Sequence, residues 1–473
     1  MNSLAPAPAP DRLSGPGPHL LVPDAVLLPE GPAEGHAVVV ADGVFRAVGP
    51  YDDVRRTHPE LDAVRLPGHL LMPGFVDAHH HLTQSFGSAL AFGEPSEIFR
   101  RVWVPLEGAL DEESAYVAAK LAALEALRGG FTTVADAGTR AAVDVGVVAS
   151  AARDAGIRCV LGLVCNDAPE GDHRNTPPGG PVLEAAEKHL ARFAEEPLIH
   201  PSLAVSIPEA ATSATLHATA RLAAEAGAVV QIHVNEHLAG VERSLVRHGL
   251  RPLEHLHRIG ALGPQLLAAH ATLLTPHELT LLADTGTAVS YNPVASAWKG
   301  NAVAPATAMA ERGIRFGLGT DGTRGDGFRL AEAAEFAQRL AYGLATGDSS
   351  CGAGWTWLEH ATAGGADAVG LGTRTGRIAP GLAADFLLVD VTTPELALSW
   401  DVPWELVRRG NRDQITGVYV AGRLRMWHGE PTGWDAPALV QQAKRLARAA
   451  VGKSPITRVH PTSTAARERS RAL

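Results

Sequence analysis

Short apolar segments alternate with longer stretches of helical periodicity through most of this chain. Each apolar segment is bounded by glycine, proline or polar residues, a pattern that predicts a buried strand. The predicted strands lie at residues 70–81, 131–137, 157–164, 199–206, 229–234, 266–270, 288–291 and 314–319. Ala-rich helices are expected between them, for example at residues 112–128, 211–226 and 330–345. These eight β/α units predict an α/β fold, a closed (β/α)8 TIM barrel in preference to an open sheet.

Apolar segments at both ends of the chain predict a second, smaller domain. Before residue 70, the step Ala41-Asp42-Gly43 separates two apolar runs and predicts a hairpin turn. Residues 376–390 and 415–423 are again rich in strand-forming residues, and the N-terminal strands are their simplest partners. We expect a disordered N-terminus at 1–18, a small β-sandwich domain from 19–69 plus 373–430, the barrel at 70–372, and a C-terminal helix with a mobile tail at 431–473.

The composition narrows the class of protein. Hydrophobic residues make up 46% and charged residues 19% of the 473 residues, enough apolar material for a large core. The formal net charge of −10 argues against nucleic acid or an anionic membrane as a partner. The three cysteines are too few for a disulfide framework. No apolar run reaches the roughly 18 residues of a membrane span. The Pro/Ala-rich start lacks the pattern of a secretory signal. We therefore expect a cytoplasmic protein with a small-molecule substrate.

The first predicted barrel strand ends in three consecutive histidines, His79, His80 and His81. Because successive side chains of a strand point to opposite faces, His79 and His81 share one face, and His80 points away and is expected to be structural. Two imidazoles on one face can bind a single divalent ion, although a polar turn after a core strand is an alternative interpretation. A second such pair, His255 and His257, lies in a helical stretch, where positions two apart do not share a face.

Three other predicted strands also end in ionisable side chains. Strand five presents His233 and Glu236, strand six presents His270, and strand eight presents Asp321. In a barrel of this kind the chemistry takes place at the C-terminal ends of the strands. Ionisable groups at four strand ends that face one mouth therefore predict a common site.

Taken in order, several motifs resemble those of the amidohydrolase superfamily. The resemblance covers about residues 35–425 and is to the branch that holds cytosine, guanine and S-adenosylhomocysteine deaminases and the triazine hydrolases. The motifs are Pro73-Gly74-Phe75-Val76-Asp77-Ala78-His79-His80-His81, Gly130-Phe131-Thr132-Thr133-Val134, Ile232-His233-Val234-Asn235-Glu236, Ala269-His270, Gly319-Thr320-Asp321 and the return into the β domain at 376–390. Residues 103–107 also resemble a substrate-facing segment of the deaminases in this branch.

The resemblance implies a centre with one metal ion. One Zn²⁺ or Fe²⁺ would be held by His79, His81, His233 and Asp321. The residues that end strand four, at 203–208, include no lysine. This disfavours a two-metal centre bridged by a carboxylated lysine.

The resemblance also implies catalytic roles. The ion would lower the pKa of its bound water, and Asp321 would take the proton of that water. Glu236 would protonate the ring nitrogen next to the carbon under attack and then pass a proton to the leaving amine. His270 would hydrogen-bond the attacking hydroxide and stabilise the developing tetrahedral centre.

Two departures from this branch concern the substrate. Pro208-Glu209 stands where the branch usually has Pro-His, and the residues after Asp321 differ from the usual Ser-Asn pair. We therefore expect that Glu209, Arg324 and Asp326 indicate a substrate different from those of this branch. Candidate substrate contacts are Gln84, Trp103, Glu209, Trp298 and Arg324. Alternatively, the charged members of this set form structural ion pairs and the tryptophans pack in the wall.

The leading hypothesis is a metal-dependent aminohydrolase, which hydrolyses carbon–nitrogen bonds other than peptide bonds. It would release ammonia from an amino-substituted nitrogen heterocycle or amidine by attack of a metal-bound hydroxide. A second hypothesis is hydrolysis of a cyclic amide, or displacement of another leaving group, on the same centre. A third is a metal-binding homologue that has lost catalysis. The resemblance also implies a homodimer or a higher homo-oligomer.

Overall fold

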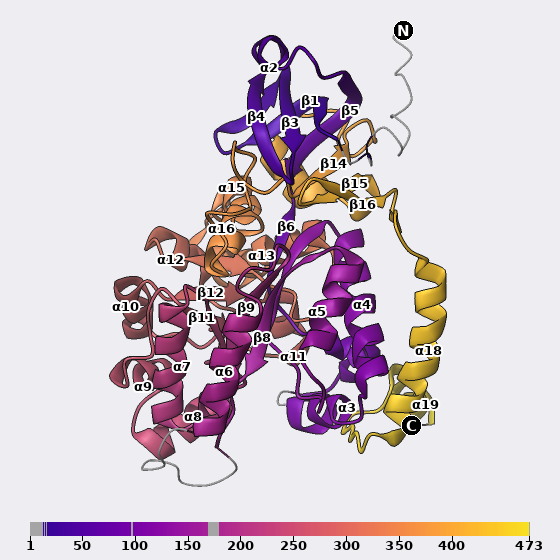
Figure 1. Cartoon of the computed structure of the whole chain (residues 1–473). Coiled ribbons are helices and arrows are strands. Elements are labelled where there is room, and N and C mark those ends of the chain that lie inside the picture. The colour runs from indigo at the N-terminus through magenta and orange to yellow at the C-terminus, as the bar shows by residue number, and fades with distance from the viewer. Residues whose placement is uncertain (1–12, 14, 16, 96–97, 169–178, 473) are drawn as a thin grey trace.

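Eight parallel strands form a nearly closed barrel at the centre of the molecule (Figure 1). The computed structural model describes Leu13, Gly15 and residues 17–95, 98–168 and 179–472. The barrel strands are β6 (Phe75–His80), β7 (Phe131–Asp136), β8 (Arg158–Val164), β9 (Ile199–Val205), β10 (Val230–Val234), β11 (Leu266–His270), β12 (Ala288–Tyr291) and β13 (Phe316–Leu318). The predicted barrel is confirmed, and two of its strands, β11 and β12, have the predicted bounds.

Helices surround the barrel and form its outer layer. The helices of the barrel region are α3 (Val104–Glu107), α4 (Glu112–Arg128), α5 (Gly146–Ala155), α6 (Gly180–Arg192), α7 (Ser213–Glu225), α8 (Leu238–His248), α9 (Pro252–Arg258), α10 (Pro276–Thr285), α11 (Pro293–Lys299), α12 (Ala306–Glu311), α13 (Gly327–Gln338), α14 (Leu344–Thr346), α15 (Ala353–His360) and α16 (Ala363–Ala368). Tighter or wider turns occur at η1 (Leu82–Ala91), η2 (Phe99–Trp103), η3 (Pro208–Ala210) and η4 (Arg339–Gly343). Among the described helices, none is long and apolar enough to cross a membrane.

Strands from both ends of the chain build a second, mixed sheet above the barrel (Figure 1). From the N-terminal part come β1 (His19–Leu28), β2 (Gly31–Glu34), β3 (His36–Ala41), β4 (Val44–Pro50) and β5 (Ala63–Pro73), with helix α2 (Tyr51–Thr57). From the C-terminal part come β14 (Phe386–Asp390), β15 (Ile415–Val420), β16 (Arg423–Trp427) and β17 (Glu430–Pro431), with α17 (Val402–Arg409) and η5 (Arg412–Gln414). The two parts join where β14 pairs antiparallel with β5. The prediction that both ends contribute to this domain is therefore confirmed.

The predicted turn after Ala41 has the geometry of a tight hairpin. Asp42 and Gly43 have φ values of 52° and 80°, and they connect the antiparallel strands β3 and β4. Positive φ at both central residues is characteristic of the two-residue hairpin loop whose twist matches that of the flanking strands.

The apolar run at residues 70–81 forms parts of two strands in different sheets. Its first residues end β5, which pairs with β1 and β14, and the expected boundary at 69/70 falls inside this strand. Gly74 then separates β5 from β6, and a Cβ at this position would overlap the side chain of Thr132. Any larger residue at this point would therefore have to displace the side chain of Thr132. Apolar patterning alone does not detect this division, because both parts are buried.

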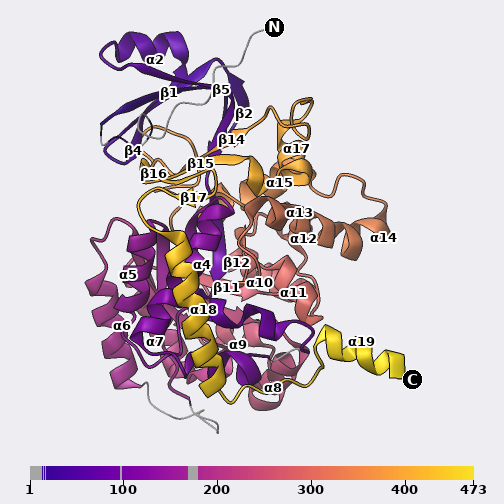
Figure 2. The ribbon, with the colours of Figure 1, turned by 90° about the vertical axis from the view of Figure 1, so that its right-hand side faces the viewer.

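Helix α18 (Ala436–Lys453) lies along α4 on the outside of the barrel and is followed by α19 (Ser463–Ala472) (Figure 2). The segment between them contacts Glu94, whose side chain is fully buried. The carboxylate of Glu94 accepts hydrogen bonds from the backbone N–H groups of Val459 (3.0 Å) and His460 (3.2 Å). It also pairs with Arg101 (2.6 Å) and Arg458 (3.1 Å). The tail expected to be mobile thus has a defined attachment, whereas most of the N-terminus expected to be disordered lies outside the described residues.

Glu94→Gln should release the segment around Val459 from the barrel. Burial alone would raise the pKa of Glu94, but the hydrogen bonds of Val459, Arg101 and Arg458 lower it to about 2. Hydrogen bonds to a buried charge stabilise by about 1.5–3 kcal/mol, so amide exchange in residues 455–461 should rise about tenfold or more. Hydrogen exchange followed by mass spectrometry measures this.

The same attachment should weaken in acid. A carboxylate with a lowered pKa stabilises the folded form above its unfolded pKa, about 4.3, and this contribution is lost as the pH falls through about 2. Glu468→Gln, at an exposed position of α19, is the control. Unchanged exchange in Glu94→Gln would show that the carboxylate does not hold the tail.

Candidate active site

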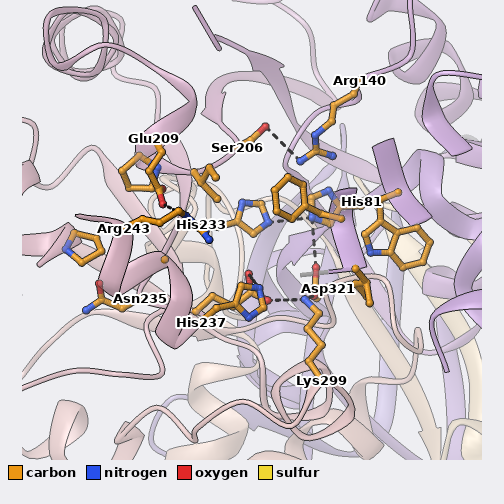
Figure 3. Close-up of a pocket in the computed structure, with 18 of the residues that line it drawn as sticks. His81, Arg140, Ser206, Glu209, His233, Asn235, His237, Arg243, Lys299 and Asp321 are labelled. Carbon is orange, nitrogen blue, oxygen red and sulfur yellow. Dashed lines mark hydrogen bonds and ion pairs between the residues drawn. The ribbon is translucent and has the colours of Figure 1, made fainter. Parts of the chain in front are cut away.

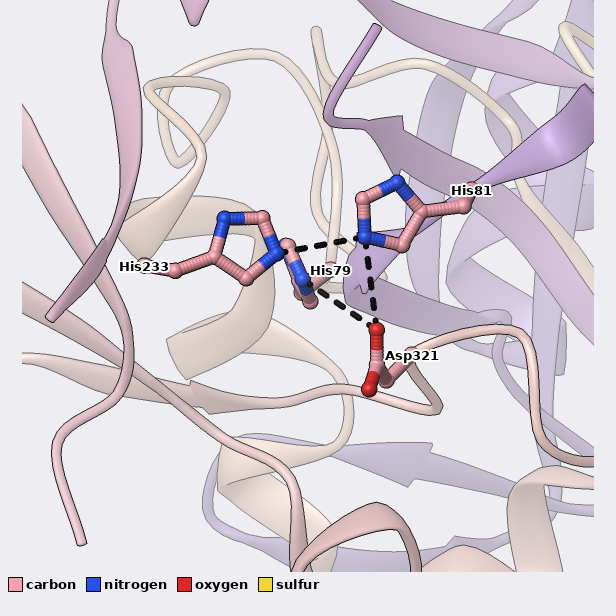
Figure 4. Close-up of side chains that lie close together, drawn as sticks. All are labelled: His79, His81, His233 and Asp321. Atoms are coloured by element: carbon pink, nitrogen blue, oxygen red, sulfur yellow. Dashed lines mark hydrogen bonds and ion pairs between the residues drawn. The ribbon is translucent and has the colours of Figure 1, made fainter. Parts of the chain in front are cut away.

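Four side chains converge at the C-terminal mouth of the barrel (Figure 4). His79 lies in β6 and His81 directly follows it, His233 lies in β10, and Asp321 follows β13. Their ligand atoms all lie within 4.8 Å of one another. The structure therefore brings together the residues that the resemblance implies as metal ligands.

The spacing of these atoms fits a tetrahedral metal site. The Nε2 atoms of His81 and His233 are 3.2 Å apart, and Oδ1 of Asp321 lies 3.5 Å from Nε2 of His79 and 3.4 Å from Nε2 of His81. Metal–ligand bonds of about 2.0–2.1 Å in tetrahedral geometry place neighbouring ligand atoms about 3.3 Å apart. In addition, both ring nitrogens of His79 are buried and have no hydrogen-bond partner. Donor atoms at this spacing fit a divalent metal ion.

The electrostatics of the cluster keep its donors in the forms that bind metal. Burial lowers the pKa of His81, and burial together with the neighbouring histidines lowers the pKa of His233 well below its usual value. Burial opposes ionisation of Asp321, but the charge of Lys299 and the contacts with the neighbouring histidines hold its pKa well below the usual range. At neutral pH His81 and His233 are therefore neutral imidazoles and Asp321 is an ionised carboxylate, as metal ligation requires.

The strand ends that carry these side chains have unusual backbone conformations. Asn235 (φ 52°), His270 (φ 71°), Ala271 (φ 46°) and Asp321 (φ 54°) all lie in the left-handed region. Each such residue costs on the order of 1–3 kcal/mol and persists only where the surrounding structure enforces it. These four residues lie where β10, β11 and β13 turn their side chains toward the mouth.

His80 points away from the metal cluster, as strand alternation predicts. Its Nδ1 lies 2.9 Å from Oδ2 of Asp77 and 2.9 Å from Oγ1 of Thr320, and the side chain is almost completely buried. The hydroxyl of Thr320 donates to the same Asp77 oxygen, while its backbone N–H donates to the other. His80 thus belongs to a buried network that ties β6 to the residues following β13.

Glu236 and His270 stand beside the metal cluster. Nε2 of His270 has no hydrogen-bond partner and lies 3.7 Å from Oε1 of Glu236 and 3.9 Å from Oδ2 of Asp321. Nδ1 of His270 lies 3.2 Å from the side-chain amide nitrogen of Asn292. Because this amide nitrogen donates the hydrogen bond, Nδ1 accepts it and Nε2 carries the ring proton. Burial lowers the pKa of His270 to about 3, so the ring is neutral. His270 can therefore donate a hydrogen bond into the site.

Lys299 and His237 contact the carboxylates of the site but are not among the residues predicted from the sequence. The ammonium group of Lys299 lies 2.7 Å from Oε1 of Glu236 and 2.7 Å from Oδ2 of Asp321 (Figure 3). The ring of His237 lies 3.1 Å from Oε2 of Glu236. His237 directly follows Glu236 in the chain, and this adjacency could have indicated that it belongs to the site. Lys299 ends helix α11 rather than a strand, so a search restricted to strand ends does not find it.

These neighbours determine the charge of Glu236. Burial alone would raise its pKa, but His270, Lys299 and His237 hold it well below the usual value. Conversely, burial alone would lower the pKa of Lys299, and the two carboxylates raise it. Glu236 is therefore a carboxylate in the resting site and must receive a proton before it can donate one.

A cavity opens above this cluster, and several predicted substrate contacts line it. Gln84, Trp103 and Glu209 line this cavity, and Trp298 lines an adjoining one together with Gln84 and Trp103. Arg324 lines neither of them. It lies 3.3 Å from Asp326, and its side chain is 47% exposed.

Two arginines of the cavity wall form further ion pairs, and Figure 3 shows the one between Arg243 and Glu209. Glu209 pairs with Arg243 of α8 at 3.1 Å. Arg140 pairs with the fully buried Glu107 at 2.9 Å and donates a hydrogen bond to the hydroxyl of Ser206. Both arginines line the cavity, so the charged wall opposite the metal cluster is largely compensated by acidic partners.

With the site in place, comparison with known proteins identifies the family. The sequence profile of the Amidohydrolase family matches residues 70–425, which include the barrel and the return into the β sheet. The chain belongs to the Amidohydrolase family. A shorter match, to the bacterial imidazolonepropionase-like composite domain, covers residues 37–60.

Two curated relatives of this amidohydrolase cover most of the chain. A 5-methylthioadenosine/S-adenosylhomocysteine deaminase of Syntrophobacter fumaroxidans is 31% identical over 417 residues, 87% of this chain and 93% of the relative. A 5'-deoxyadenosine deaminase of Methanopyrus kandleri is 30% identical over 381 residues, 80% of this chain and 86% of the relative.

Solved structures are similar over almost the whole amidohydrolase chain. An adenosine deaminase from Xanthomonas campestris with bound zinc has a TM-score of 0.82 and 27% identity, and the match covers 93% of this chain and 100% of that one. An atrazine chlorohydrolase from Arthrobacter aurescens, in complex with zinc, has a TM-score of 0.80 and 21% identity over 90% and 99% of the two chains. The second likeness shows the shared fold alone.

His81→Ala should weaken the binding of a divalent metal by more than about 100-fold, since loss of a direct ligand exceeds the 10–100-fold cost of losing a supporting hydrogen bond. Metal content after dialysis against a chelator, measured by mass spectrometry, tests this. His257→Ala is the matched control, because His257 belongs to the other His-x-His pair and is exposed on α9. Equal metal content in the two variants would contradict the assignment of His81.

Proposed function

We propose that this amidohydrolase is a metal-dependent aminohydrolase that releases ammonia from an amino-substituted nitrogen heterocycle. The observation that carries the proposal is the convergence of the four metal-binding donors with Glu236 and His270 at the mouth of the barrel, where His81, His233, Glu236 and Asp321 line one cavity. We assign the ion as Zn²⁺, held by His79, His81, His233 and Asp321. The bound zinc of the adenosine deaminase and the near-tetrahedral spacing of the donors support this choice.

The residues of the site suit the proton transfers of such a hydrolysis. The ion, when bound, would lower the pKa of a water molecule toward neutrality. Oδ2 of Asp321 and Oε1 of Glu236 share the ammonium group of Lys299 at 2.7 Å each. Both carboxylates are ionised, so either of them can accept a proton beside the donors. Glu236 starts as a carboxylate, and we assign it the transfer of one proton of the attacking water to the ring nitrogen. We assign it also the transfer of the second proton of that water, released from the attacking oxygen, to the amine as the carbon–nitrogen bond breaks. His270 donates from Nε2 to the oxygen on which charge develops.

The two curated relatives support an adenosine-type substrate, because their names state deamination of adenosine derivatives. Glu209, however, indicates that the substrate of this protein differs in part from those of the relatives. It occupies the position where the resemblance leads one to expect histidine, and its carboxylate is bound to Arg243. We therefore propose that the reacting ring is of the aminopurine type, whereas the group attached to it differs from that of the relatives.

Glu236→Gln should lower kcat for ammonia release by about 10²–10⁴-fold, because the amide cannot transfer a proton. Its metal content should stay unchanged, since Glu236 is outside the proposed ligand set. A glutamate-dehydrogenase-coupled assay over adenosine-type nucleosides, aminopterins and aminotriazines measures ammonia. The masses of the products separate loss of ammonia from opening of a cyclic amide, the alternative reaction of the same centre.

Two results would refute the proposal. Ammonia release that survives complete removal of metal would exclude the metal-dependent mechanism. Full activity in Glu236→Gln would exclude the proposed proton transfer. Glu242→Gln, in the neighbouring helix α8, is a control for unspecific effects of removing a carboxylate.

A further inference from the structure

Lys299 brings a positive charge directly to the reacting centre. It is the last residue of α11, and Gly300 in the left-handed conformation (φ 67°) ends this helix. The ammonium group bridges Oε1 of Glu236 and Oδ2 of Asp321 at 2.7 Å each, and the side chain is only 13% exposed. The lysine is therefore held at its helical end and at its ammonium group, which indicates a defined position rather than a surface side chain.

The contacts of Lys299 are compatible with the proposed metal site. Asp321 turns Oδ1 toward His79 and His81 and Oδ2 toward Lys299. Glu236 likewise turns Oε2 toward His237 and Oε1 toward Lys299. Because Asp321 contacts Lys299 through Oδ2 and the two histidines through Oδ1, the ammonium group does not compete for the oxygen that faces the metal cluster.

The position between the two carboxylates would otherwise attract a cation. Oε1 of Glu236, Oδ2 of Asp321 and Nε2 of His270 form a second group of possible metal-binding atoms within 4.8 Å of one another. Nε2 of His270 is fully buried and unpartnered. Amidinium groups and divalent ions are both attracted to such paired carboxylates. In this protein the ammonium group of Lys299 occupies that position.

From this arrangement we infer that Lys299 is the built-in cation of the active site and a specificity-determining residue that restricts the substrate to neutral molecules. The inference rests on the proposed function and narrows it. Neutral aminoheterocycles can approach Glu236 and Asp321, whereas guanidinium and amidinium compounds meet the like charge of Lys299 within hydrogen-bonding distance of both carboxylates. Arg140 and Arg243, which also line the cavity, pair with Glu107 and Glu209 instead. The charge that stands between the two reacting carboxylates is therefore that of Lys299.

Benzamidine and benzamide provide a matched test, because they have nearly the same shape and differ in charge. Dissociation constants of both would be measured by calorimetry for the wild type and for Lys299→Met, with the metal content of each sample determined. The ratio of the benzamidine constant to the benzamide constant should fall about tenfold or more in Lys299→Met. Lys299→Arg keeps the charge and should keep the ratio of the wild type. Lys188→Met, at a position whose side chain is 74% exposed, is the surface control.

Each outcome bears on the inference. A second divalent ion bound by Lys299→Met would also support it, because that ion would replace one cation by another. An unchanged ratio with unchanged metal content, or a wild type that binds benzamidine more tightly than benzamide, would overturn it. Lys299→Gln serves as a second variant if the methionine variant does not fold. Binding requires no turnover, so absence of ammonia release in the wild type would refute the proposed function and leave this ratio measurable.

Discussion

The site depends on the closure of the barrel between its first and last strands. Asp77 of β6 accepts hydrogen bonds from the backbone N–H and the hydroxyl of Thr320, which follows β13. One residue later, the N–H of Asp321 donates to the carbonyl of His79 at 2.8 Å. These bonds set Asp321 beside the histidines before any ligand is present. Small residues allow this approach, since a Cβ on Gly317 would lie 2.9 Å from that of Ala78.

Much of this arrangement could be predicted from the sequence, because it follows from backbone periodicity. Alternation along a strand separates His80 from its neighbours, and the C-terminal face of a barrel selects His233, His270 and Asp321 from the 21 histidines and the many acids. The division of the apolar run at Gly74 could not be predicted, because a strand buried in either sheet has the same apolar pattern. The three-dimensional structure explains the division, because a Cβ at Gly74 would overlap the side chain of Thr132.

The position of Lys299 illustrates a second limit of prediction from the sequence. A lysine at the end of a short helix is usually solvated, and nothing in its neighbours along the chain indicates otherwise. Its role depends on two carboxylates from β-strand ends that lie 63 and 22 residues away in sequence. The same holds for Glu209, whose partner Arg243 comes from another β/α unit. Sequence periodicity places side chains on faces, whereas long-range pairing decides what those side chains contact.

The pairing of β5 with β14 has a consequence for the way the chain folds during synthesis. β5 is made early, but its partner β14 belongs to the last fifth of the chain. At about 5–20 residues per second, the apolar edge of β5 stays unpaired on the ribosome for tens of seconds while the whole barrel is translated. An unpaired apolar edge is a template for association with other chains. Nascent molecules of this amidohydrolase therefore pass through an aggregation-prone interval that ends only when the C-terminal strands emerge.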